Sequence, residues 1–251
     1  MTQFSLWTTR DDRVVGTHRL SILEMDESKF DDAVAVLIPS FTQHYIKPER
    51  LERALRRGGR RAEIALANRT PTTSRTRSGD FGEILGTNYL KEELNYMAVF
   101  RLRWKDNAKL PMRGDDLLGV RVNIKNELEF LKGEAKSGQR PGASVISKAR
   151  QALDQYNGMP NPVSVAFLVD RLEESGEVEL SDRVDDVMTE EGITADNVEH
   201  LLFIFSGTDA SSLVNNDIGA QGGRIAQVGV VVRAVSHQKL IQTVFDGVVH
   251  G

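Results

Sequence analysis

A turn centred on Asn126 separates two strand-length runs, and this hairpin constrains the fold more than any other feature of the sequence. With that centre, Asp116 faces Lys136 and Leu118 faces Glu134. Because alternate residues of a strand share a face, these four side chains lie on one surface. The strands cover residues 116–124 and 128–136, and the same surface also carries Val120, Val122, Ile124, Leu128 and Phe130. An apolar, core-facing surface therefore ends in two acids and a lysine, and buried charges need a partner or a metal ion.

The Glu-Ala-Lys triplet places Glu134 and Lys136 side by side, about 6–7 Å apart along the strand. One lysine neutralises one carboxylate, so the second carboxylate, Asp116, requires a further cation. Carboxylate oxygens suit Mg²⁺ or Mn²⁺. An adjacent lysine can orient an attacking water and stabilise charge on a phosphorane-like transition state. The alternative is a structural lysine–carboxylate ion pair at a sheet edge. In either case Asp115 points to the opposite face.

A third acid, Glu83, lies in a helix expected over residues 79–94. One face of this helix carries Gly79, Gly82 and Gly86. Small residues let a helix backbone approach a sheet closely, so Glu83, which borders that face, could reach the other two acids. The alternative is structural, because Asp80 and Glu83 have the spacing of a capping box.

Apolar periodicity after residue 78 predicts an α/β domain in which helices flank a mixed sheet. The expected element order is α-β-β-β-α-β. Helices are expected at residues 79–94 and 144–156, and strands at 96–104, 116–124, 128–136 and 163–169. Apolar runs at 201–205 and 228–232 predict two further buried strands, followed by a short terminal helix.

The chain before this pattern is expected to be a mainly helical accessory segment, residues 1–77, joined to a second domain, residues 78–251. Asp26 is a candidate N-cap of a helix that Pro39 ends. The polar stretch 70–78 has no hydrophobic period and is expected to form the connection between the two parts.

Charge is unevenly distributed along the chain, although the formal net charge is only −4. Residues 47–77 hold ten lysines and arginines against three glutamates, whereas residues 173–199 hold eleven acids and one arginine. Each segment is either a binding surface or a solvated face. The basic side chains that could follow a phosphate backbone or meet an acidic partner are Arg50, Arg53, Arg56, Arg57, Arg60 and Arg61.

Several classes of protein are excluded by what the sequence lacks. The 251 residues contain no cysteine, which excludes disulfide scaffolds, thiolate metal sites and cysteine nucleophiles. There is no P-loop motif, and the five histidines show no paired metal-ligand spacing. No apolar run reaches the roughly 18 residues that span a membrane, and no signal sequence is evident. We therefore expect a cytoplasmic protein without membrane attachment.

Three segments carry a family resemblance: Ser78–Leu85 (SGDFGEIL), Arg113–Val120 (RGDDLLGV) and Lys132–Ser137 (KGEAKS). An early helix acid, a Gly-x-Asp motif and a Glu-x-Lys motif together resemble the PD-(D/E)XK nuclease superfamily. The fuller strings resemble the HamA family, the nuclease subunits of Hachiman anti-phage systems. The resemblance covers mainly residues 78–170 and implies a restriction-endonuclease-like fold. Arg113 and Gly114 stand where the superfamily nominally has a proline before the aspartate.

The resemblance also implies roles for individual residues. Asp116 and Glu134 match the catalytic acids that bind Mg²⁺ or Mn²⁺, Lys136 matches the catalytic lysine, and Glu83 matches the helix acid. The family further implies a DNA nuclease that works with a HamB-like helicase subunit in a defence complex.

Two alternatives remain open at the level of sequence. The fold could serve as a catalytically idle DNA-binding or regulatory module, although such a module would be expected to have lost one of Asp116, Glu134 and Lys136. It could also be a stand-alone repair or restriction nuclease. An adjacent helicase gene would favour a nuclease that works in a defence complex over both alternatives.

Overall fold

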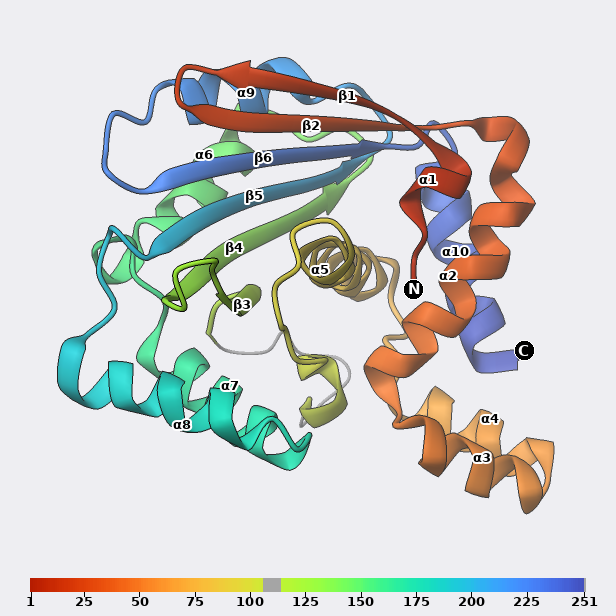
Figure 1. Ribbon diagram of the computed structural model, residues 1–251. Coiled ribbons are helices and arrows are strands. Elements are labelled where there is room, and N and C mark those ends of the chain that lie inside the picture. The colour runs from red at the N-terminus through yellow and green to blue at the C-terminus, as the bar shows by residue number, and fades with distance from the viewer. Residues whose placement is uncertain (106–113, 251) are drawn as a thin grey trace.

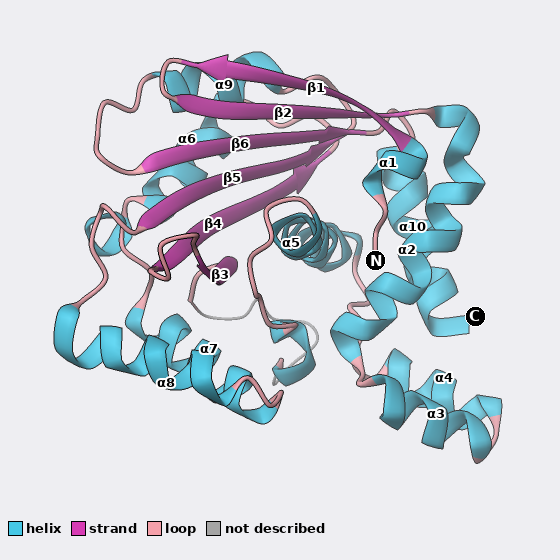
Figure 2. Cartoon of the chain, in the orientation of Figure 1, coloured by secondary structure: helices cyan, strands magenta, loops and turns pink. Residues whose placement is uncertain are grey.

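The computed structural model describes residues 1–105 and 114–250, which form a mixed six-stranded sheet with helices on both faces (Figures 1 and 2). The order of strands across the sheet is β1-β2-β6-β5-β4-β3. The strands are β1 (Thr8–Val15), β2 (His18–Met25), β3 (Leu117–Val122), β4 (Leu128–Gly138), β5 (Val198–Ser206) and β6 (Ala226–Arg233). The outer pairs β1–β2 and β3–β4 are antiparallel, and the inner pairs are parallel. The predicted α/β class with a mixed sheet is confirmed.

Helices cover the two faces of the sheet unequally. The helices are α1 (Phe4–Trp7), α2 (Phe30–Tyr45), α3 (Pro48–Arg56), α4 (Gly59–Ala67), α5 (Ser74–Glu92), α6 (Ala143–Leu153), α7 (Pro162–Glu174), α8 (Val178–Asp186), α9 (Ser211–Gly219) and α10 (His237–His250). Shorter turns of helix are η1 (Glu27–Lys29), η2 (Arg101–Trp104), η3 (Gln155–Gly158) and η4 (Val187–Glu191). Helices α2, α5 and α10 lie on one face, and α6 and α9 lie on the other (Figure 1).

Three apolar clusters hold these layers together. The largest joins α1, α2, α5 and α10 to one face of the sheet and includes Trp7, Phe81 and Phe245. A second cluster lies beneath α6 and α9, and a third joins α7 and α8 to the hairpin. Burial of this apolar surface is the main force that fixes the sheet between its helices. Within the described residues, no helix is both long enough and apolar enough to span a membrane.

The first segment departs from its predicted character. Residues 8–25 form β1 and β2 rather than helices, and β2 pairs with β6 in register Arg19↔Val228. The prediction of a mainly helical segment over residues 1–77 is therefore wrong for these strands, although α2, α3 and α4 are helical as expected. The division of the chain at residue 77 remains a prediction, and the two strands show that the first segment shares the sheet with the rest.

Pro39 does not end its helix, contrary to prediction, because α2 continues through it to Tyr45. Leu37, Phe41 and Tyr45 are fully buried against the core. This packing compensates for the backbone hydrogen bond that proline cannot donate. Helix α5 likewise begins at Ser74, inside the expected connection at residues 70–78, and the Thr73 side chain caps it by accepting a hydrogen bond from the Thr76 N–H.

Two expected strands are absent from the sheet. Residues 96–104 form only a single bridge, Met97 to Val120, before η2. Residues 163–169 lie within helix α7, whose start is set by the Asn161 side chain accepting from the Val163 N–H and by Pro162 in the first turn. The expected α-β-β-β-α-β order is therefore not observed. Arg113, the first residue of the second resemblance segment, lies outside the described residues.

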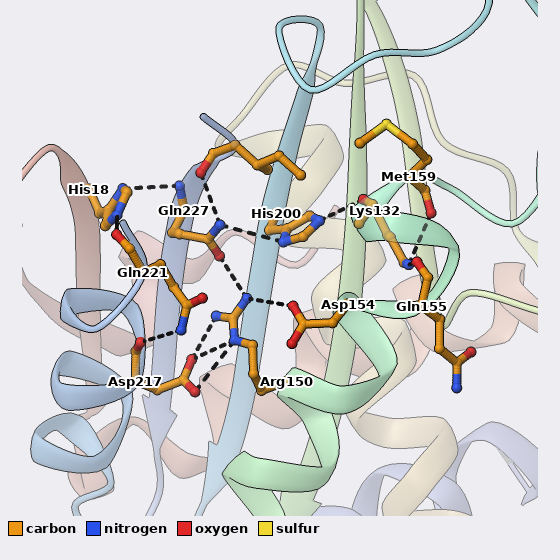
Figure 3. A network of polar contacts seen from close by, with 12 residues as sticks. His18, Lys132, Arg150, Asp154, Gln155, Met159, His200, Asp217, Gln221 and Gln227 are labelled. Carbon is orange, nitrogen blue, oxygen red and sulfur yellow. Dashed lines mark hydrogen bonds and ion pairs between the residues drawn. The ribbon is translucent and has the colours of Figure 1, made fainter. Parts of the chain in front are cut away.

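A buried polar network ties the far face of the sheet together (Figure 3). Arg150 of α6 donates to Asp217 of α9 at 2.6 Å and to the Gln227 side chain of β6 at 3.0 Å. His200 of β5 donates from Nε2 to the Gly158 carbonyl at 2.7 Å, and its Nδ1 lies 3.5 Å from Gln227 Nε2. The network therefore joins β5 and β6 to α6 and α9, and the contact from Gln227 Nε2 to His200 Nδ1 requires a neutral His200.

His200 is expected to make the fold sensitive to acid. Burial lowers the pKa of His200 to about 4, so the unfolded chain binds a proton near pH 6.5 before the folded protein does. The free energy of unfolding should therefore fall as pH decreases from 6.5 to 4. His200→Gln, which keeps a donor but cannot titrate, should reduce this fall by roughly 2–3 kcal/mol in urea unfolding measured at pH 7 and pH 4.5. His250→Gln, at an exposed position, is the control. An unchanged pH dependence in His200→Gln would contradict this account.

Candidate active site

The hairpin forms where the sequence predicted it, but its register differs by two residues. Leu118 pairs with Lys132 rather than with Glu134, and Val120 pairs with Phe130. Continuing this register by one pair beyond β3 places Asp116 opposite Glu134 instead of Lys136. Because the difference is an even number, Leu118, Val120, Leu128 and Phe130 still share one face. Val122 and Ile124, which were expected on this core-facing surface, are instead exposed, because β3 ends at Val122 and Ile124 lies in the turn.

Asp116, Glu134 and Lys136 meet at the end of this surface. Lys136 Nζ lies 3.7 Å from Asp116 Oδ2 and forms a close ion pair with Glu134 Oε1. The Ala135 N–H donates to Asp116 Oδ2 at 3.3 Å, which fixes that carboxylate against β4. All three side chains are partly buried, with exposed fractions of 23%, 13% and 29%. One lysine is therefore shared by two carboxylates in a partly water-excluded position.

Glu83 approaches the same cluster from helix α5, as predicted. A Cβ at Gly82 would come within 3.2 Å of the Ser137 side chain, and one at Gly86 within 2.7 Å of Leu117. These glycines therefore let α5 lie directly on the hairpin. The buried Oε2 of Glu83 has no hydrogen-bond partner within the part of the chain that the structure describes.

The capping-box alternative for Glu83 is not observed. Asp80 lies well inside α5, where its carboxylate pairs with Lys105 at 2.7 Å and accepts from the Tyr45 hydroxyl at 2.9 Å. Sequence reasoning missed both partners, because Lys105 and Tyr45 come from segments distant in the chain and carry no motif.

The electrostatics of the cluster favour protonated carboxylates. Burial, and then the neighbouring Asp116, raises the pKa of Glu83 to about 8 and that of Glu134 to about 7. Burial disfavours the charged form of Lys136, but Asp116 and Glu134 outweigh it and raise the pKa of the lysine. Added positive charge would therefore be stabilised here, because it would let these acids ionise beside Asp116, where one lysine cannot neutralise them all.

Asp115 contacts α7 and Lys132 rather than Glu134 or Lys136, and because Lys132 alternates with Glu134 on β4, the predicted opposite-face position of Asp115 is not observed. Its carboxylate accepts from the Asn161 N–H at 2.7 Å and lies 4.0 Å from Lys132 Nζ. Its own N–H donates to Ser164 Oγ at 2.9 Å, and its carbonyl accepts from Arg101. Asp115 therefore anchors the start of β3 to α7. Arg101 lies in the range 96–104 that is expected to form a strand, so the sequence carries no signal for this contact.

The predicted basic side chains lie on α3 and α4, which project from the body of the molecule (Figure 1). Arg50, Arg53, Arg57, Arg60 and Arg61 are exposed. Among the described residues, none of these five forms an ion pair, whereas Arg56 pairs with Glu52 at 3.0 Å. The structure does not bring these arginines into the acid cluster.

A metal ion would have to rearrange the acids. In the ranges 1–105 and 114–250, no three His, Asp or Glu side chains already have the arrangement of a metal site. The donor set nevertheless suits a hard divalent cation, because it consists of carboxylate oxygens, one of which is buried without a partner. Glu134 now faces Lys136, so a metal ion would compete with the lysine for that carboxylate.

The fold and site define an α/β protein in which two acids and a lysine of one hairpin meet a helix acid. A family model described as HamA matches residues 2–248, so the chain belongs to the HamA family. It is also 25% identical over 206 residues to the Hachiman protein HamA of Bacillus cereus, a match that covers 79% of this chain and 73% of that protein.

Proposed function

We propose that this protein is a metal-dependent deoxyribonuclease that hydrolyses the phosphodiester bonds of DNA. The observation that carries the proposal is the meeting of Asp116, Glu134 and Glu83 around one lysine. The acid, acid and lysine pattern resembles the PD-(D/E)XK superfamily, which supports this reaction class. The likeness of the whole chain to the HamA family adds support from outside the site.

In this proposal Asp116, Glu134 and Glu83 hold Mg²⁺ or Mn²⁺. A bound cation would make a coordinated water more acidic and would polarise a phosphate oxygen. The Ala135 N–H keeps the Asp116 carboxylate oriented. Lys136, which pairs with Glu134 in this structure, would direct its ammonium group towards the attacking water and the charge that develops on phosphorus.

We further propose that the nuclease is the effector of a Hachiman anti-phage defence complex. The similarity to the Hachiman protein HamA of Bacillus cereus supports this assignment. A DNA nuclease without a sequence reader would attack the host chromosome, so its activity requires restraint. We assign that restraint to a HamB-like helicase partner, which docks through charged surfaces such as the acidic segment 173–199.

Metal dependence is the direct test of the nuclease assignment. Purified protein, with and without the helicase encoded beside it, is incubated with plasmid and linear DNA. We expect cleavage with Mg²⁺ or Mn²⁺, and none with EDTA. Cleavage that persists in EDTA would contradict the metal mechanism. Absence of cleavage under every condition, helicase included, would favour the idle binding module, and strong helicase-independent cleavage that leaves the host unharmed would favour a stand-alone nuclease.

A further inference from the structure

A hollow of about 540 Å³ lies beside α3, outside the acid cluster. Its lining includes Arg50 and Arg53 of α3, Arg69 from the end of the α4 segment and Arg103 of η2. A second hollow shares Arg50, Arg69 and Arg103 and reaches Lys105. A third, of about 420 Å³, continues along α3 and α4 past Arg57 and Arg61. Together they form a row of adjoining depressions, which we call the arginine row.

The arginine row lacks the negative charge that would balance it. Within the described ranges, none of Arg50, Arg53, Arg69 and Arg103 has a carboxylate at ion-pair distance, and the lining acids of the first hollow are Glu49 and Glu174 alone. Burial, and then the charge of Arg50, lowers the pKa of Arg69. A bound anion would reduce the repulsion between these neighbouring guanidinium groups.

Two of the arginines are held in place by the backbone. Arg103 donates from Nε to the Gln43 carbonyl at 2.7 Å, and its guanidinium lies 4.6 Å from the centre of the Phe100 ring. Arg69 donates from Nη1 to the Arg103 carbonyl at 3.0 Å. Such fixed guanidinium groups lose little conformational freedom when they bind a ligand.

The row leads towards the acid cluster. Tyr45 lines the first hollow, and its hydroxyl donates to Asp80 of α5 at 2.9 Å. Lys105, which lines the second hollow, pairs with the other oxygen of Asp80 at 2.7 Å. Asp80 lies three residues before Glu83, and residues at this spacing are neighbours on one side of a helix. Buried contacts of Tyr45 and Lys105 with Asp80 therefore join the row to the helix that carries Glu83.

We propose that the arginine row binds the phosphodiester backbone of the DNA strand that flanks the bond to be cut. This inference rests on the proposed nuclease function and adds where the substrate lies. The row consists of arginine rather than lysine, and the guanidinium fork binds phosphate oxygens in pairs. Helix α3 is about 13 Å long, which equals about four steps of the roughly 3.4 Å axial rise of a DNA duplex.

Binding is measured without cleavage, in the Glu134→Ala background and in EDTA. Fluorescence anisotropy with a labelled 20-base-pair duplex, and with its single strand, gives the dissociation constant over a range of salt concentrations. The combined change Arg50→Ala and Arg53→Ala should weaken binding about tenfold or more, and should lower the slope of log K against log salt by about 2. Arg56→Ala, which removes an arginine of the same helix that already pairs with Glu52, should change affinity less than about twofold.

An unchanged affinity and salt slope in the double variant would overturn the proposal, and would leave an acidic protein surface as the ligand of the row. Both residues are exposed, so circular dichroism should show an intact fold. Cleavage by the unmodified protein is scored separately. If the double variant binds DNA more weakly but the unmodified protein does not cleave, the nuclease proposal fails and DNA binding by the arginine row stands. If the unmodified protein cleaves but the double variant binds DNA normally, the nuclease proposal stands and DNA binding by the arginine row fails.

Discussion

Glu134→Gln is expected to abolish DNA cleavage, with the initial rate on plasmid DNA falling about a thousandfold or more. The substitution keeps the size of the side chain but removes the charge that a cation would need. Asp116→Asn and Lys136→Met should give losses of similar size, because the first removes a metal ligand and the second the charge directed at the transition state. Circular dichroism and urea unfolding should show that each variant is folded.

Asp115→Asn is the matched control for these variants, since it changes the adjacent acid, which pairs with α7 and Lys132 instead of Lys136. It weakens the contacts with the Asn161 N–H and Lys132. We expect it to lower the free energy of unfolding by about 1–3 kcal/mol while cleavage persists. An active Glu134→Gln protein would remove the basis of the nuclease proposal. An inactive Asp115→Asn beside an active Asp116→Asn would show that the roles of the two acids are reversed.

Gly133→Val should be among the most destabilising single changes in the chain. A Cβ at this position would lie 2.8 Å from the Cβ of Leu117 and 3.2 Å from the Cβ of Leu201, on the strands to either side of β4. Neither contact can be relieved by rotating a side chain, because both Cβ atoms are attached directly to the backbone. We expect a loss of about 3 kcal/mol or more in the free energy of unfolding, measured in urea.

Gly138→Ala, at the end of the same strand, is the control, because nothing lies within 4 Å of its added Cβ. It should change stability by less than about 1 kcal/mol. A Gly133→Val protein as stable as the Gly138→Ala variant would mean that β3 and β5 can move apart at Gly133. The close approach of Leu117 and Leu201 to β4 would then not require glycine at position 133.

The sequence was most informative where one strand face is apolar and the other is not. Alternation in the hairpin predicted which side Asp116, Glu134 and Lys136 share, and the structure confirms it. The register was wrong by two residues because the turn contains Asn123 to Glu127 and its centre lies at Lys125 rather than at Asn126. Alternation repeats every two residues, so it cannot detect an error of that size.

Elements without such a contrast were missed. The six central residues of β1 are all exposed and include four consecutive charged residues, Arg10 to Arg13, so this edge strand has no apolar period to recognise. In α7, Val163 and Val165 suggested a strand, but the Asn161-Pro162 start and the buried Val165, Leu168 and Leu172 are typical of a helix. Local capping outweighed the β preference of valine.

The pairing of β2 with β6 has a consequence for the order in which the protein can assemble during synthesis. Arg19 and its partner Val228 are 209 residues apart, and every strand from β3 to β5 is made between them. At roughly 5–20 residues per second, the ribosome needs about 10–40 s to deliver β6 after β2 has emerged. Until then the β1–β2 hairpin has no parallel neighbour, and α2 has no α10 to pack against. Closure of the sheet, and with it the arrangement of α5 over the acids, is therefore expected to be one of the last steps of folding during synthesis.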